Sequence, residues 1–256
     1  MSKDLSSIRK NYAILSGVAL GSAGLFFISQ ILAVLVLVIV LKLLGNSGGE
    51  IENLLEANSL VQLVLVTMVA SLSVFLVLKI LKYLHEKPKK FLLLENKPTL
   101  KNLKDIAITY AGYFLTLVVV VVIINIINAT FFPNAPLIDT EQAQDLGVQG
   151  ASGWGLVPVF LMLVVIPPIY EEIIFRGFLF NMLRKKGSLI VSGILTSVMF
   201  GAAHLEFNNL NWIAAIDTLI FSGFLIYISQ KHKSLYSSMI MHAVKNSIAF
   251  YVLFVR

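Results

Sequence analysis

The feature that most constrains the fold of this chain is a series of long apolar runs separated by short polar segments. Seven such runs can be followed along the 256 residues, at about 14–44, 60–81, 106–127, 154–184, 188–204, 212–229 and 235–255. A helix that crosses a bilayer needs about 20 predominantly apolar residues. The runs are continuous rather than alternating, which argues against a membrane β-barrel. The sequence therefore predicts an all-α, polytopic integral membrane bundle of about seven transmembrane helices, with six to eight as the range because the first run is unusually long.

Composition supports a membrane protein and excludes several kinds of site. The chain is 57% hydrophobic and 13% charged, about half the charged fraction of a soluble domain. The net charge of +6 comes from lysines that cluster between the apolar runs, so it indicates membrane topology and no nucleic-acid partner. Cysteine is absent, which excludes disulfides, thiolate metal sites and a cysteine nucleophile.

The polar segments predict how the chain is oriented. The basic segments 79–104, 184–186 and 231–233 are expected in the cytoplasm, together with the N-terminus. The linker 128–153 has three acidic residues and no lysine or arginine, so it is expected outside, and 46–59 is predicted to be a polar loop. Short loops and the lack of cysteine favour the bacterial cytoplasmic membrane.

Three charged residues interrupt the fourth run, namely Glu171, Glu172 and Arg176. A charge at the centre of a membrane helix costs about 2.5–3.5 kcal/mol on insertion scales. Glu172 and Arg176 are four residues apart, so they share a helix face and can form an ion pair. Glu171 points about 100° away from Glu172 and has no cation three or four residues away. We therefore expect Glu172 and Arg176 to support a site in which Glu171 is free to act.

Two histidines and an amide on later runs are the candidate partners of Glu171. His204 ends the fifth run, and His242 precedes Asn246 by one helical turn in the seventh. A carboxylate beside a histidine can activate water as a general base, and a histidine with an amide on one face can stabilise an oxyanion. Two histidines and a glutamate are also a possible zinc set with an open water position. The residue types leave both mechanisms open, and both favour hydrolysis of a peptide bond inside the membrane.

Four other polar residues are interpreted as surface groups. His85 lies in the basic loop and His232 lies between two lysines, so both are expected to be solvated. Lys245 is expected to extend to the cytoplasmic surface, as long basic side chains near helix ends do. Asp217 is expected at the external end of the sixth run.

The polar residues of the last four runs fall into three ordered motifs. These are Glu171-Glu172-x-x-x-Arg176, Phe200-x-x-x-His204 and His242-x-x-x-Asn246. The ordered set resembles the CPBP family, which comprises the CAAX prenyl endopeptidases and the bacterial Abi-type proteins. The resemblance covers about 154–255. It divides the chain into an N-terminal part, 1–153, with about three spans, and a catalytic core, 154–256, with about four.

The resemblance implies a role for each matching residue. Glu171 and His204 would activate the attacking water, while His242 and Asn246 would stabilise the tetrahedral oxyanion or share a metal. The family is often described as metalloproteases, and a metal-free mechanism that depends on glutamate is also argued for it. Any zinc would be held by His204, His242 and Glu171. We favour no required cofactor, because an asparagine in fourth place is a poor zinc ligand.

The favoured function is an intramembrane endopeptidase that acts on small membrane-associated proteins or peptides, including leader, bacteriocin or signalling peptides. Its partners would be that substrate and the lipid bilayer. The alternative is a non-catalytic immunity or regulatory scaffold that binds a partner through the same cavity. A third reading, a transporter with a proton relay, is disfavoured because no inverted repeat is visible.

Overall fold

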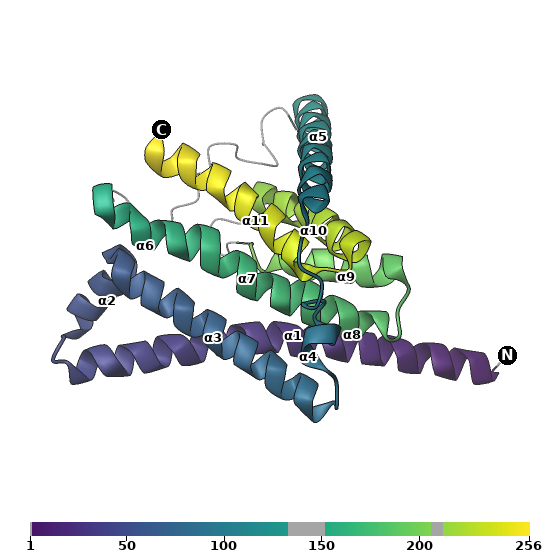
Figure 1. The fold of residues 1–256 in the computed structure, drawn as a ribbon, viewed down its shortest axis with the longest axis horizontal. Helices are drawn as coiled ribbons and strands as arrows, with labels where there is room; N and C mark the ends of the chain where they lie inside the picture. The colour runs from purple at the N-terminus through teal and green to yellow at the C-terminus, as the bar shows by residue number, and fades with distance from the viewer. Residues whose placement is uncertain (1, 133–151, 206–211) are drawn as a thin grey trace.

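The computed structural model describes residues 2–132, 152–205 and 212–256, and within these ranges all the regular structure is helical (Figure 1). The helices are α1 (Ser2–Leu43), α2 (Gly48–Ala57), α3 (Ser59–Tyr83), α4 (Pro88–Phe91), α5 (Leu100–Phe131), α6 (Leu156–Phe160), α7 (Ile166–Glu172), α8 (Phe180–Arg184), α9 (Leu189–Ala202), α10 (Trp212–His232) and α11 (Leu235–Phe250). π-Helical turns at Leu161–Val165 and Ile173–Leu179 join α6, α7 and α8 into one helix, and another at Tyr251–Val255 extends α11.

The predicted all-α membrane bundle is confirmed. Six helices in the described ranges are long and apolar enough to cross a bilayer. The seventh apolar helix, α9, has 14 residues, which at 1.5 Å per residue is about 21 Å and shorter than the apolar core of a bilayer. Most of the linker predicted to be external, 133–151, lies outside the described residues.

The segment 46–59, predicted as a loop, contains the helix α2. Ser47 begins this helix with a capping box, in which its hydroxyl accepts from the Glu50 amide while the Glu50 carboxylate accepts from the Ser47 amide at 2.7 Å. This reciprocal pairing satisfies backbone donors that the first turn of a helix leaves free. The loop prediction was wrong because it was based only on the polar composition of the segment. The capping-box spacing of Ser47 and Glu50, three residues apart, would have indicated a helix.

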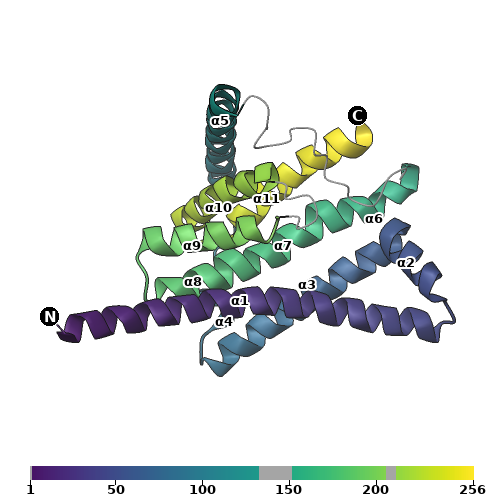
Figure 2. The same cartoon turned by 180° about the vertical axis from the view of Figure 1, so that it is seen from behind.

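The helix formed by α6, α7 and α8 runs through the middle of the bundle (Figures 1 and 2). α1 and α3 pack on one side of it, and α9 and α11 pack on the other, with α10 against both of the latter. Every side chain of the turn Ile173–Leu179 is buried. The charged motif of the fourth run therefore lies in the interior of the protein and not against lipid.

The basic segments gather at one end of the bundle. Lys185, just after α8, forms an ion pair with Glu86 in the lysine-rich loop. The same loop meets the start of α11, where the Leu235 amide donates to the Leu93 carbonyl at 2.9 Å. The three segments predicted to share one side of the membrane are thus neighbours in space.

His232 belongs to this end of the bundle, and its predicted solvation is wrong. Its Nε2 lies 3.0 Å from an Asp105 carboxylate oxygen and its Nδ1 lies 2.9 Å from the Ser237 hydroxyl. Only 6% of the histidine side chain is exposed. The ring links α5, α10 and α11, a contact between distant helices that neighbouring lysines in the sequence do not reveal.

The close approach of α9 and α10 depends on Gly201. A Cβ atom at this position would lie 2.8 Å from the Ala215 carbonyl oxygen and 3.1 Å from the Leu219 Cβ. The first contact is with backbone, which cannot rotate away. Since Gly201 is three residues before His204, the packing that it permits also sets where that histidine lies.

We expect Gly201→Ala to destabilise the protein by about 1–3 kcal/mol, the usual cost of overpacking, measured as a lower midpoint of thermal unfolding in detergent. Gly193→Ala is the matched control, because a Cβ there meets nothing within 4 Å on the same helix. The control should lose no stability, since alanine favours helix over glycine by about 1 kcal/mol. Equal midpoints for the two variants would contradict the close-approach argument.

Candidate active site

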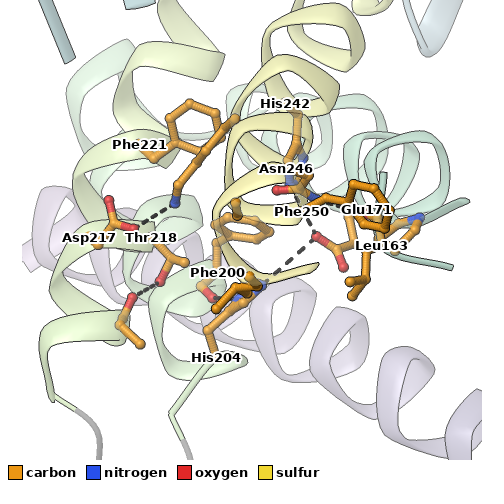
Figure 3. A pocket seen from close by; sticks show the side chains of 15 residues that line it. Leu163, Glu171, Phe200, His204, Asp217, Thr218, Phe221, His242, Asn246 and Phe250 are labelled. Atoms are coloured by element: carbon orange, nitrogen blue, oxygen red, sulfur yellow. Dashed lines mark hydrogen bonds and ion pairs between the residues drawn. The ribbon is translucent and has the colours of Figure 1, made fainter. Parts of the chain in front are cut away.

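The candidate site is a cavity of about 320 Å³ among α7, α9, α10 and α11. Figure 3 shows Glu171 on one side of it and Asp217, Thr218 and Phe221 on the opposite side. Its wall is made by Leu163, Pro167, Glu171, Phe200, His204, Ala214, Asp217, Thr218, Phe221, His242, Lys245, Asn246, Ala249, Phe250 and Leu253. Eight of these fifteen residues are apolar, and the seven polar ones face a common space.

The structure brings together all four residues predicted to be catalytic. Glu171, His204, His242 and Asn246 line this one cavity from three separate helical segments. The Glu171 Oε2 atom lies 4.0 Å from the His204 Nε2 and 3.9 Å from the His242 Nε2. Within the described part of the chain this oxygen has no hydrogen-bond partner. Glu171 therefore presents an unsatisfied acceptor to both histidines.

His204 is held by the end of its own helix. Its Nδ1 lies 2.8 Å from the Phe200 carbonyl oxygen, four residues earlier. The regular helical donor to that carbonyl would be the His204 amide, which instead bonds to the Gly201 carbonyl at 3.1 Å. Since a carbonyl only accepts, the proton lies on Nδ1, and Nε2 is left to face Glu171. The spacing Phe-x-x-x-His thus fixes both the position and the tautomer of this ring.

His242 is held from behind by Glu172. Its Nδ1 lies 3.1 Å from the Glu172 Oε1 atom, and its Nε2 faces the cavity. The two histidines therefore have the same design, because each uses Nδ1 for anchoring and turns Nε2 toward Glu171. An outer carboxylate or carbonyl that orients an imidazole in this way is a common arrangement in hydrolytic sites.

The predicted pair of Glu172 and Arg176 lies directly behind the cavity. The Glu172 Oε1 and Arg176 Nη1 atoms are 3.1 Å apart, and neither side chain is exposed. The guanidinium carbon lies 4.0 Å from the centre of the Phe200 ring, a cation–π contact. That ring also lies against His204, with 4.5 Å between ring centres. The pair thus supports both the α9 and the α11 sides of the site.

Asn246 is fixed by a backbone carbonyl of the central helix. Its Nδ2 donates to the Leu163 carbonyl oxygen at 2.8 Å. A carbonyl only accepts, so the nitrogen of the amide group, and not its oxygen, faces Leu163. The second hydrogen of Nδ2 is left for another acceptor.

The three candidate zinc ligands do not fit a zinc ion in this arrangement. Ligand atoms about 2.1 Å from a tetrahedral zinc lie about 3.4 Å from one another, whereas Glu171 Oε2 is 3.9–4.0 Å from the two imidazole nitrogens. Within residues 2–132, 152–205 and 212–256, no three acidic, histidine or cysteine side chains have metal-binding geometry.

The predicted surface position of Lys245 is wrong. Lys245 does not extend to the surface: it lines the cavity, where its Nζ lies 2.6 Å from the Asp217 Oδ2. Tyr113 of α5 donates its hydroxyl to the other Asp217 oxygen. The sequence could have indicated this position of Lys245. His242, Lys245 and Asn246 have i, i+3, i+4 spacing, which puts the lysine on the same helix face as the predicted site.

Residues 153–248 match the family model described as Rce1-like, type II CAAX prenyl endopeptidase Rce1-like. The matched segment is less than half of the chain and includes all three motifs. This match confirms the resemblance to the CAAX prenyl endopeptidases. No curated protein and no solved structure gave a match to the chain.

We expect Arg176→Met to lower the free energy of unfolding by about 3–5 kcal/mol, because it leaves the Glu172 carboxylate buried without its cation. The double variant Glu172→Gln/Arg176→Met should recover a large part of this loss, since it leaves no buried unpaired charge. Unfolding in mixed micelles measures both. A double variant that is less stable than Arg176→Met would contradict the ion-pair explanation.

Proposed function

We propose that this protein is an intramembrane endopeptidase with Glu171 as its general base. The match of residues 153–248 to the Rce1-like model of type II CAAX prenyl endopeptidases supports a CAAX-type protease. The observation that carries the proposal is the convergence of the Glu171 Oε2 and the two histidine Nε2 atoms within 4.0 Å. Each of these atoms faces the cavity, and none is needed to hold its own side chain in place.

The first step is activation of water. Atoms 4.0 Å apart, such as Glu171 Oε2 and His204 Nε2, are too distant for a hydrogen bond, but one water can lie about 2.8 Å from both. Glu171 takes a proton from this water while Nε2 of His204 accepts a hydrogen bond from its other hydrogen. The oxygen is thereby directed at the scissile carbonyl carbon and forms the new C–O bond.

The second step is collapse of the tetrahedral intermediate. The free hydrogen of the Asn246 amide donates to the oxyanion, and His242, on the same face of α11, donates from Nε2 when its ring carries both protons. The Glu172 carboxylate 3.1 Å from Nδ1 counterbalances that positive charge. The C–N bond then breaks, and Glu171 returns its proton to the leaving amine.

The proposed substrates are small membrane-associated proteins or peptides. The cavity wall is about half apolar and lies in a bundle of membrane-spanning helices, so a substrate must present an apolar or lipid-modified segment to reach it. The clustering of the basic segments at one end supports an orientation with that end in the cytoplasm.

The proposal predicts that Glu171→Gln abolishes cleavage, lowering kcat by at least about 10²-fold, the lower end of the contribution expected of a general base. The purified protein in nanodiscs is incubated with a panel of prenylated CAAX-type peptides and unmodified amphipathic peptides. Mass spectrometry then identifies new peptide termini. Glu56→Gln is the matched control, because it makes the same chemical change at an exposed position of α2.

The outcome that contradicts the proposal is a folded wild-type protein that cleaves no peptide of the panel, or a Glu171→Gln variant that cleaves as fast as the control. In the first case, retained peptide binding would favour a non-catalytic scaffold. Thermal unfolding of each variant shows that lost cleavage does not come from lost folding.

A metal-free reaction predicts that chelation changes little. After dialysis against EDTA and 1,10-phenanthroline, kcat should stay within about twofold, because Glu171 and the histidines act on water directly. Metal content is measured on the same sample by mass spectrometry. Activity that falls with chelation and returns with zinc would overturn the metal-free mechanism.

A further inference from the structure

The contact between Asn246 and Leu163 has an unusual origin in the central helix. In an α-helix the carbonyl of residue 163 accepts from the amide of residue 167, and in a π-helix it accepts from the amide of residue 168. Both of these residues are prolines, which have no amide hydrogen. The remaining nearby donor, the amide of Ile166, bonds to the Leu161 carbonyl instead. The Leu163 carbonyl therefore has no donor within its own helix.

Two prolines are needed because the helix changes register at this point. It is α-helical at Leu156–Phe160, π-helical at Leu161–Val165 and α-helical again from Ile166. A single proline would block only one of the two registers, and the other amide could then capture the Leu163 carbonyl. Two adjacent prolines block both.

A carbonyl left without a donor inside a membrane bundle needs a partner from elsewhere. Asn246 supplies it from α11, 83 residues further along the chain, at 2.8 Å. Because the same amide lines the cavity, the bond that satisfies the carbonyl also orients a residue of the candidate site. Pro167 lines the cavity as well, so one proline of the pair and the amide belong to the same cavity wall.

We propose that Pro167 and Pro168 are positioning residues that keep the Leu163 carbonyl free to hold the Asn246 amide, with its second N–H directed at the reacting carbonyl. The role of Asn246 in catalysis rests on the proposed function. The orientation of its amide does not.

The central test is Pro167→Ala/Pro168→Ala, which restores both amide donors. Either amide can then bond to the Leu163 carbonyl and release Asn246. Losing one oxyanion donor costs about 10²–10³ in kcat, so a misdirected donor should lower kcat by at least about 10-fold with KM unchanged. The midpoint of thermal unfolding should not fall, because proline in a helix interior is itself unfavourable by about 3 kcal/mol.

Pro158→Ala is the matched control. Pro158 is buried in the same continuous helix but is absent from the cavity wall, so its replacement should leave kcat unchanged. A double-mutant cycle completes the kinetic test. In the Asn246→Ala background, the two proline replacements should lower kcat no further, since there is no amide left to release. A fall of the same size in both backgrounds would show that the prolines act through helix shape alone, and would overturn the proposal.

A spectroscopic readout separates this proposal from the function on which it rests. In protein labelled with ¹⁵N-asparagine, the Asn246 side-chain resonance is assigned by its loss in Asn246→Ala. Its hydrogens should exchange slowly with solvent in the wild type and in Pro158→Ala, and at least about 10-fold faster in Pro167→Ala/Pro168→Ala, which corresponds to about 1.4 kcal/mol. Unchanged exchange would overturn the positioning role whatever the activity. Faster exchange in a protein that cleaves no peptide would support the positioning and reject the proposed function alone.

Discussion

The buried ion pair between Glu172 and Arg176 is the interaction on which the rest of the site depends. Taking an ion out of water costs several kcal/mol, and both of these side chains are fully buried. The cost is tolerable only if their partners are held at contact distance by close packing. The partners are His242 on α11 and the Phe200 ring on α9. By requiring these contacts, the pair holds two of the helices that carry the candidate catalytic residues.

The cost of burying a charge also explains why the adjacent residues Glu171 and Glu172 have different roles. Glu172 points inward, where arginine and histidine compensate its charge. Glu171, one residue earlier on the helix, points into the cavity, where its Oε2 lacks a hydrogen bond from any described residue. A helix rotates by about 100° per residue, so two consecutive carboxylates necessarily face different surroundings. One of them can therefore stabilise the site while the other is left to react.

The sequence could predict interactions between residues of one helix, but not interactions between residues of different helices. The long apolar helices follow from hydrophobic runs, and the Glu172–Arg176 pair and the shared face of His242 and Asn246 follow from spacing within one helix. All of these are present. Pairings between helices could not be read in this way. Lys245 has two satisfactory environments in a membrane chain, the lipid headgroups or a buried carboxylate, and only the packing of α10 against α11 selects Asp217. His232 was misjudged for the same reason, because its partner Asp105 lies on another helix.

Backbone carbonyls position the site as much as charges do. In a bilayer a carbonyl that loses its helical donor has no water to replace it, so each irregular point must attract a polar side chain. The Phe200 carbonyl near the end of α9 holds the His204 ring, and the Leu163 carbonyl before the two prolines holds Asn246. In both cases the side chain that satisfies the carbonyl is the one that lines the cavity. The irregular stretches of helix are therefore the parts that a hydrolytic site inside a membrane most needs, since a perfectly regular helix would offer these side chains nothing to bind.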